Sequence, residues 1–328
     1  METQLGKRRM PTLTWGILFY VATHAACGEP RAHTPELRDI SGVARSGDTL
    51  LLVDDEEPAV YFRFPIAQSP GPLILLDRSR LEAVPLVAAN LAVDLESIDV
   101  LADGRVVVLS ERLRALLDSQ GVVVEYDPLL AEVGRRGLEG LAVQHLPGGS
   151  SRIAVLWEGG YPEYGDLHPQ LRNSAGHSAL RPLVLVHDLK KDQRLRGLRL
   201  TDAANVVELH VPLPAGQEPE AQRFRAPDLV WASWMGRRGQ EIGFIVLISS
   251  LNSSGLREYR YHWLLRFTLA GEPVGEPLDL DRLAPELKGV NWEGLAWFEE
   301  SRTLVAVCET SKTGRPVALL IPVPAAWR

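Results

Sequence analysis

The sequence predicts an all-β fold, a β-propeller of four-stranded antiparallel blades, and two observations support this class. Five segments repeat one pattern: an acidic or polar start, an apolar strand, a turn, a second strand rich in valine and leucine, and another acid. Helical periodicity is nearly absent, with Leu113–Asp118 as the short helical candidate and a loop as the alternative for it. Strands that recur in units of several tens of residues are typical of propellers. We therefore expect five blades, with a sixth between the third and fourth repeats as the alternative.

The five repeats align on their first strands and on the turns that follow. Their first strands are Asp39–Ala44, Asp94–Ile98, Leu138–Ala142, Pro227–Trp231 and Asn291–Ala296. The turns Gly47-Asp48 and Asp103-Gly104 are strong hairpin signals, because these residues adopt positive φ at little cost. Further strands are expected at Ala59–Phe64, Val122–Tyr126, Pro182–His187, Val206–Val211, His262–Leu269 and Pro316–Ile321. Two unrelated β-sandwich domains would not explain why the same start recurs.

The repeated acids occupy two positions that a propeller blade brings together. The first strand starts at the face to which the second strand returns, so the two positions are neighbours across the hairpin. The starting positions are Ser41, Glu96, Glu139, Asp228 and Glu293, and the returning positions are Asp55, Glu111, Glu158, Ser250 and Glu309. Most of these residues are carboxylates. The sequence therefore predicts an acidic cluster at one mouth of the central channel.

Carboxylates gathered in this way repel one another and require cations, basic neighbours or protonation. Oxygen-only ligands suit calcium or magnesium, and the sequence has no His/Cys set for zinc. We expect a divalent cation, with calcium favoured, on some of Glu96, Glu111, Glu139, Glu158, Glu293 and Glu309. One alternative is ion pairing with the basic residues that adjoin the acids in sequence, Arg112, Arg135, Arg136, Lys312 and Arg315. The other is a scaffolding role in which the acids join each blade to the next.

Two connections on the same face are expected to contact a ligand. Gly159–Leu180 is long enough to serve as a binding or lid segment, and Asn252–Arg260 carries arginines suited to a phosphate or carboxylate. The residues expected to bind a ligand are Tyr161, Tyr164, Arg257 and Arg260, and the candidate proton donors are His168 and His177. A tolerated insertion and a solvated surface are the alternatives for these two connections.

The first 27 residues have the outline of a secretory signal. A basic group, Lys7–Arg9, precedes the apolar run Leu13–Ala22 and the sequence Ala25-Ala26-Cys27. The run is too short to span a bilayer comfortably, which takes about 20 residues. We expect residues 1–27 to be a signal peptide, with cleavage at a lipoprotein-type Cys27 as one alternative, and residues 28–328 to form a single propeller domain. The expected location is the periplasm or cell envelope, with any membrane link made through a lipid on Cys27.

Composition narrows the range of partners. The 328 residues are 45% hydrophobic and 23% charged, which is typical of a globular chain, and the net charge is −7. A nucleic acid or an anionic membrane surface requires a basic face, so neither is expected, whereas a small molecule is. The sequence contains no nucleophile elbow, Walker loop or zinc-protease motif. The sequence leaves the oligomeric state undetermined.

The repeated Glu-Gly-Leu-Ala units at 139–142 and 293–296 resemble those of the esterase-like phytase family of propellers and the related SdiA-regulated group. Two further features resemble those families. Second strands end in Ser110-Glu111 and Cys308-Glu309-Thr310, and Arg136-Gly137 directly precedes the third repeat. The pattern departs from the family at Ser41, Asp228 and Ser250. The resemblance implies an exported propeller with cation-assisted hydrolysis of phosphoester or other ester bonds. The alternative is a non-catalytic propeller of the cell envelope that binds a ligand and holds a structural ion.

Overall fold

The computed structural model describes twelve stretches of the chain, and the predicted signal peptide lies outside them. The stretches are residues 37–57, 59–66, 71–86, 93–127, 137–158, 182–199, 202–212, 223–236, 239–251, 259–298, 301–308 and 315–327. The chain divides into two units, Met1–Thr34 and Pro35–Arg328, and every described element belongs to the second. Among the described residues, no helix has both the length and the apolar character needed to cross a membrane.

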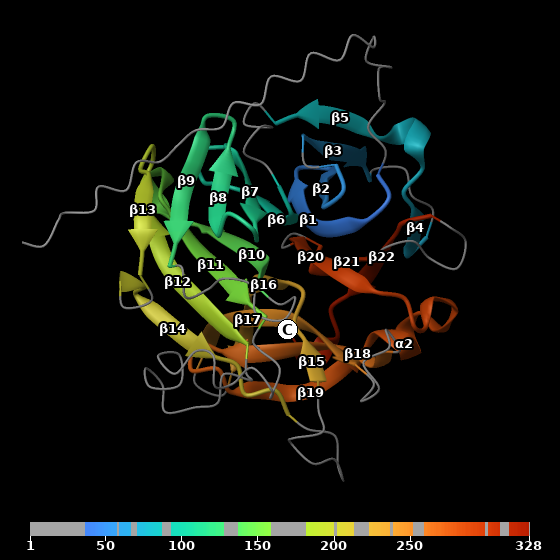
Figure 1. Ribbon diagram of the computed structural model, residues 1–328. Helices are drawn as coiled ribbons and strands as arrows, with labels where there is room; N and C mark the ends of the chain where they lie inside the picture. The colour runs from blue at the N-terminus through green and yellow to red at the C-terminus, as the bar shows by residue number, and fades with distance from the viewer. Residues whose placement is uncertain are drawn as a thin grey trace, which may run out of the picture. The chain divides into compact units, whose positions relative to one another are not determined.

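Five sheets form the blades of the propeller, and the innermost strand of each comes from one sequence repeat (Figure 1). The first blade consists of β1 (Ile40–Ser46), β2 (Thr49–Asp54), β3 (Val60–Pro65) and β5 (Glu82–Pro85). The second consists of β6 (Leu95–Val100), β7 (Val106–Ser110), β8 (Ala115–Asp118) and β9 (Gly121–Tyr126), with β13 (Leu195–Leu198) parallel to β9. The third consists of β10 (Leu138–His145), β11 (Ser151–Trp157), β12 (Leu183–Leu189) and β14 (Asn205–Glu208).

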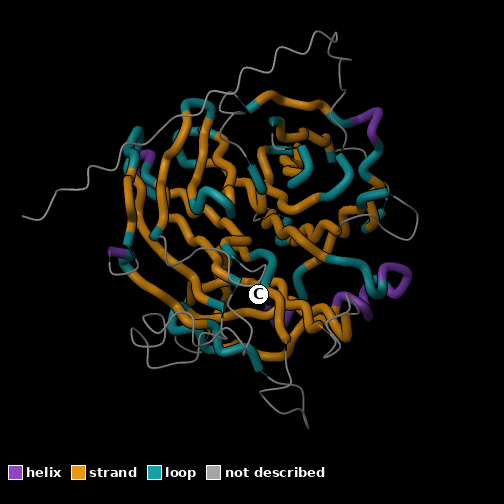
Figure 2. The backbone as a smooth tube through the Cα atoms, viewed as in Figure 1, coloured by secondary structure: helices purple, strands orange, loops and turns teal. Residues whose placement is uncertain are grey.

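The fourth blade is built from consecutive strands, whereas the fifth includes a strand from early in the chain. The fourth consists of β16 (Leu229–Gly236), β17 (Gly239–Leu251), β18 (Tyr259–Thr268) and β19 (Pro273–Asp279), with β15 (Arg223–Arg225) paired to the end of β17. The fifth consists of β20 (Trp292–Phe298), β21 (Thr303–Cys308), β22 (Val317–Pro322) and β4 (Leu73–Leu75). Short helices are few: η1 (Arg78–Arg80), η3 (Pro147–Gly149), α2 (Leu280–Leu283), η7 (Pro285–Leu287) and η8 (Ala325–Trp327) (Figure 2).

The five-bladed prediction is confirmed. The long interval between the third and fourth repeats does not form a sixth blade, because its described strands β13, β14 and β15 join the second, third and fourth blades. The helical reading of Leu113–Asp118 is wrong. Ala115–Asp118 forms β8, which is buried along its whole length and hydrogen-bonded between β7 and β9. Pairing on both edges outweighs the weak helical pattern of so short a segment.

The ring of blades closes through a strand from early in the chain. The inner strands β1, β6, β10, β16 and β20 each pack against the next, and β20 packs against β1. β4 lies between β3 and β5 in sequence but pairs antiparallel with β22 as the outermost strand of the fifth blade. The chain that runs from β3 through β4 to β5 therefore links the first and last blades. An open ring would leave the edges of the first and last blades exposed.

A β-bulge explains the Glu-Gly motif of the repeats. The pairing register shifts at Ser41 in β1, and the corresponding shifts in three other inner strands fall at Glu96, Glu139 and Glu293. A bulge of this kind re-aims a side chain and bends the strand. The next residue is glycine in three of these strands, and a Cβ on Gly42 would lie 2.6 Å from the Cα of Ser97. Glycine is favoured because the neighbouring inner strand leaves no room for a Cβ here.

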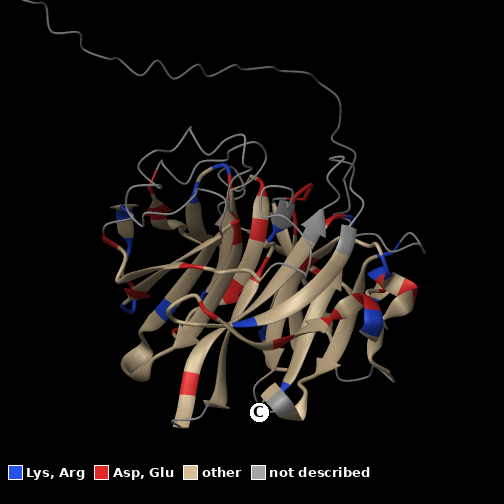
Figure 3. Ribbon diagram, turned by 90° about the horizontal axis from the view of Figure 1, so that it is seen from below, with Lys and Arg blue, Asp and Glu red and all other residues tan. Residues whose placement is uncertain are grey.

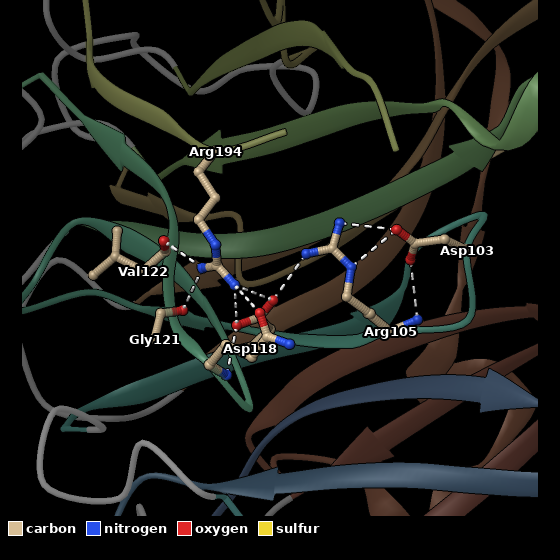
Figure 4. Close-up of polar contacts among 7 residues, drawn as sticks. Asp103, Arg105, Asp118, Gly121, Val122 and Arg194 are labelled. Atoms are coloured by element: carbon tan, nitrogen blue, oxygen red, sulfur yellow. Dashed lines mark hydrogen bonds and ion pairs between the residues drawn. The ribbon is translucent and has the colours of Figure 1, made fainter. Parts of the chain in front are cut away.

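A buried ion-pair network attaches β13 to the edge of the second blade (Figure 4). Asp118, only 1% exposed, accepts hydrogen bonds from Arg105 at 2.8 Å and from Arg194 at 2.9 Å. Arg194 also donates to the carbonyl oxygen of Val122 at 2.7 Å. A parallel edge strand as short as β13 has few ladder hydrogen bonds, so Arg194 provides much of its attachment.

Replacing Arg194 should therefore release β13. We expect Arg194→Ala to lower the free energy of unfolding by about 1–3 kcal/mol, because charge-assisted hydrogen bonds to a buried carboxylate are lost. Amide exchange in Leu195–Leu198 should accelerate. Arg196→Ala is the matched control on the same strand, because its contact with Glu125 is long, at 4.0 Å, and exposed. Equal effects of the two substitutions in urea unfolding and hydrogen exchange would contradict this assignment.

Candidate functional site

The acidic positions of the repeats meet at the end of the channel where the inner strands begin. The backbone amide of Glu111 donates to the carbonyl of Asp94 at 3.0 Å, and the amide of Glu158 donates to Gly137 at 2.9 Å. Starting and returning positions are thus neighbours in the second and third blades. Seen from the side, acidic positions lie toward the upper ends of several central strands (Figure 3). This end of the channel is called the acidic mouth below.

One arginine binds three of the acids in the mouth. Arg225 lies 3.0 Å from Glu158 and 3.4 Å from Glu139, and it also forms a short ion pair with Glu293. Its guanidinium donates a further hydrogen bond to the side-chain oxygen of Asn291 at 3.1 Å. Glu139 and Glu158 come from the third blade, and Glu293 comes from the fifth. Arg225 therefore neutralises charge and joins the third and fifth blades through the fourth.

Sequence reasoning did not identify Arg225. It lies in β15, a three-residue strand that pairs with the end of β17 and so reaches the mouth. Of the basic residues expected to pair with the acids, Arg112 contacts Asp94 at 3.4 Å and is 70% exposed, and Arg315 lies near Asp77 instead. Arg135, Arg136 and Lys312 lie outside the described residues. No local signal marks β15, because its position depends on pairing with a strand more than twenty residues away.

A second group of acids lies beside the Arg225 cluster. Asp94, Glu96 and Glu111 each offer a carboxylate oxygen, and these oxygens lie within 4.8 Å of one another. Burial, followed by repulsion from Glu139 and Glu111, raises the pKa of Glu96 well above its ordinary value. The sequence pattern places Asp94 at the start of the second repeat but does not predict it as a metal ligand. Three carboxylates at this separation suit a hard divalent cation.

Asp55, which returns from the first blade, faces the same group. Burial and the negative charges of Asp54, Glu56 and Asp94 raise its pKa to about 6. At neutral pH the carboxyl is therefore mostly ionised but remains within reach of protonation. This is the pKa range in which a carboxylate acts well as a general base.

Two of the starting positions join blades instead of facing the acids of the mouth. Ser41 donates a hydrogen bond to the carbonyl of Leu95 in the next inner strand. Asp228, only 1% exposed, accepts hydrogen bonds from the amides of Leu229 at 2.8 Å, Leu141 at 3.3 Å and Leu295 at 2.7 Å. These three amides belong to three inner strands. The scaffolding alternative therefore describes Ser41 and Asp228 well.

The predicted ligand-binding residues other than Arg260 lie outside the described stretches, whereas five of the six predicted metal ligands lie within them. Residues outside the described stretches are Tyr161, Tyr164, His168, His177, Arg257 and Glu309. Arg260 lies in β18, but its side chain is not described. Of the six predicted metal ligands, the structure brings Glu96 and Glu111 together with Asp94. It places Glu139, Glu158 and Glu293 on Arg225.

Comparison with known proteins shows no family membership. No family model matches the sequence, and no curated protein matches it. A thermostable family-43 glycoside hydrolase is similar in fold, with 9% identity, a TM-score of 0.44 and coverage of 87% of this chain and 89% of that one. XC5397, a gluconolactonase from Xanthomonas campestris, has 11% identity, a TM-score of 0.35 and coverage of 88% and 87%. Regucalcin from Agrobacterium tumefaciens, described as calcium-binding, has 8% identity, a TM-score of 0.35 and coverage of 88% and 92%.

Removal of Asp228 should weaken the contacts between inner strands. We expect Asp228→Ala to lower the free energy of unfolding by about 3–5 kcal/mol, since three buried amides lose their acceptor. Asp188→Ala is the control, because Asp188 pairs with Arg152 on the exposed part of the third blade and should cost less than about 1 kcal/mol. Urea unfolding measures both values. A loss below about 1 kcal/mol for Asp228→Ala would show that these hydrogen bonds do not hold the ring together.

Removal of Arg225 should make stability depend more steeply on pH. Arg225 lowers the pKa of Glu96 against the larger raising effect of burial, so the pKa rises further in Arg225→Gln. A raised carboxyl pKa gives stability at low pH that is lost as the pH rises through the folded value. We expect a loss of about 2–3 kcal/mol at pH 8 and a smaller one at pH 5. Arg112→Gln is the exposed control, and a pH-independent deficit in Arg225→Gln would contradict the electrostatic explanation.

Proposed function

We propose that the chain is an exported propeller that hydrolyses phosphoester or other ester bonds with a divalent cation bound in the acidic mouth. The observation that carries the proposal is the group Asp94, Glu96 and Glu111, whose ligand oxygens lie within 4.8 Å of one another. The resemblance of the Glu-Gly-Leu-Ala units to esterase-like phytases supports the same reaction class. Calcium is the favoured ion, because all three donors are carboxylates.

The electrostatics of the mouth favour a cation at this group. The raised pKa of Glu96 reflects the free-energy cost of keeping a carboxylate charged beside other carboxylates in a desolvated place. A divalent cation held by Asp94, Glu96 and Glu111 would offset that cost and would supply Lewis-acid chemistry toward an ester. Asp55, with a pKa of about 6, is the nearby carboxylate suited to act as a general base.

The arginine divides the predicted ligands into two sets. Glu139, Glu158 and Glu293 are each engaged by Arg225, whose positive charge repels a metal ion. The proposed ion site therefore uses Glu96 and Glu111, with Asp94 added. Arg225 and its glutamates form the wall of the site.

The second candidate function is non-catalytic. The hydrogen bonds of Ser41 and Asp228 and the ion pairs of Arg225 join different blades, and a structural ion would continue that pattern. In this case the mouth holds an ion and docks a small ligand without turning it over. Both functions fit export to the periplasm or cell envelope, with a lipid on Cys27 as the proposed membrane link.

Calcium titration separates these functions. If the ion binds the native state, the melting temperature should rise as calcium exceeds its dissociation constant. Glu96→Gln and Glu111→Gln should each weaken calcium binding at least tenfold, about 1.4 kcal/mol. Glu125→Gln is the control, because the Glu125 side chain, on β9 of the second blade, is exposed.

A panel of phosphoesters and carboxylic esters, assayed with and without chelator, then tests catalysis. Chelator-sensitive turnover that is lost in Glu111→Gln supports the hydrolase. Calcium stabilisation without turnover supports the structural ion. The absence of any calcium or magnesium response in calorimetry would remove the metal site from both proposals.

A further inference from the structure

The opposite end of the channel contains a cavity that the acidic mouth does not explain. Its volume is about 440 Å³, and it is lined by the parts of the inner strands that follow the bulges. Among the lining residues are Val43–Arg45 of β1, Leu141–His145 of β10 and Leu295–Trp297 of β20. Pockets of about 300–1,000 Å³ are typical of small-molecule sites. The cavity is therefore large enough for a small organic ligand.

The cavity is lined by a ring of residues, one from each blade. In four inner strands the residue that packs toward the next blade is alanine, and in β6 it is an aspartate. The five positions are Ala44, Asp99, Ala142, Ala232 and Ala296, and all five line the cavity. Small side chains at four positions leave the space open. The fifth position places a single carboxyl group in a ring of methyl groups.

The carboxyl group of Asp99 is held in one orientation by two backbone amides. One oxygen accepts from Val100 at 2.7 Å, and the other accepts from Val143 of the third blade at 2.6 Å. Burial is the main cause that raises its pKa to about 7, and His145 acts in the opposite direction. The carboxylate is thus positioned, but its charge is poorly solvated. A cationic partner would offset that cost.

The other charged groups near Asp99 already have contacts of their own. The His145 ring nitrogen lies 2.9 Å from the carbonyl of Val100. The Arg45 guanidinium stacks over Phe298 at 4.3 Å and donates to the carbonyl of Gly47 at 2.7 Å. Asp228 also lies nearby, and burial raises its pKa well above the ordinary value, so it supplies no positive charge to balance Asp99. The electrostatic surroundings of Asp99 therefore favour a positive ligand group.

We propose that this cavity binds a small organic cation whose ammonium group pairs with Asp99. The apolar part of the ligand packs within the alanine ring and against the indole of Trp297, which also lines the cavity. The net charge of −7 favours the approach of a cation over that of an anion. An uncharged alcohol of the same shape would leave the charge of Asp99 unbalanced. This site is separate from the proposed ester-hydrolysing mouth and does not depend on it.

The test is titration of the full chain, labelled with ¹⁵N, with n-pentylamine at pH 8, where Asp99 is ionised and the amine is charged. The amides of Val100 and Val143 donate to the Asp99 carboxylate and are the direct reporters. Both signals should shift and saturate with the amine. The uncharged isostere 1-pentanol should shift neither signal appreciably.

Asp99→Ala is the matched variant, because it makes the ring of five positions uniform in alanine. Binding of the amine, followed by calorimetry, should weaken at least tenfold in this variant. Asp99→Asn provides the same comparison if the alanine variant does not fold. Glu111→Gln, at the other end of the channel, should leave amine binding unchanged.

Three results would overturn the proposal. The first is the absence of saturable shifts at Val100 and Val143 up to about 50 mM amine, which corresponds to an affinity too weak for a built site. The second is equal binding of 1-pentanol. The third is amine binding that persists in Asp99→Ala and disappears in Glu111→Gln, which would place the cation in the acidic mouth.

Discussion

The carboxylate of Asp228 provides the interaction on which the ring of inner strands depends. Inner strands of neighbouring blades belong to different sheets, so no backbone ladder joins them. Asp228 compensates by accepting the amides of Leu229, Leu141 and Leu295, one from each of three blades. Ser41 makes a similar link from the first blade to the second, and Asp99 links the second to the third. Buried polar groups so placed determine which blades are neighbours, because each satisfies amides or carbonyls that would otherwise be buried without partners.

Acids at equivalent positions of the repeat therefore have different physical roles. Asp228 is enclosed by backbone amides, whereas Glu139, Glu158 and Glu293 lie on Arg225. The group of Asp94, Glu96 and Glu111 lies at one side of the mouth, where the pKa of Glu96 is raised by burial and by its acidic neighbours. A single arginine placed to one side of a nearly symmetric ring creates this asymmetry. As a result, the glutamates on Arg225 are neutralised, whereas the group of Asp94, Glu96 and Glu111 is able to hold a cation.

The bulges also make the two ends of the channel chemically different. The bulges at Glu96, Glu139 and Glu293 turn acidic side chains toward the mouth, and the residues beyond them resume strict alternation. Alanine then recurs on one face of four inner strands, and the cavity opens where those faces meet. Each residue type in the motif Glu-Gly-Leu-Ala therefore has its own role. The glutamate faces the charged mouth, the glycine allows neighbouring inner strands to approach closely, and the alanine lines the cavity. Asp99 stands where the other four inner strands have alanine, and it places a carboxyl group at the cavity end of the channel.

The sequence by itself determined the all-β class, the five blades and the pairing of starting and returning acids. These features follow from alternation, turn residues and repetition, which are local properties of the chain. The tertiary structure alone decided that β4 completes the fifth blade, that β8 is a strand and that β15 carries Arg225 to the mouth. It also decided which carboxylates are neutralised and which face one another. Those outcomes depend on contacts between residues tens or hundreds of positions apart, and the energies of such contacts come from burial and charge in the assembled ring.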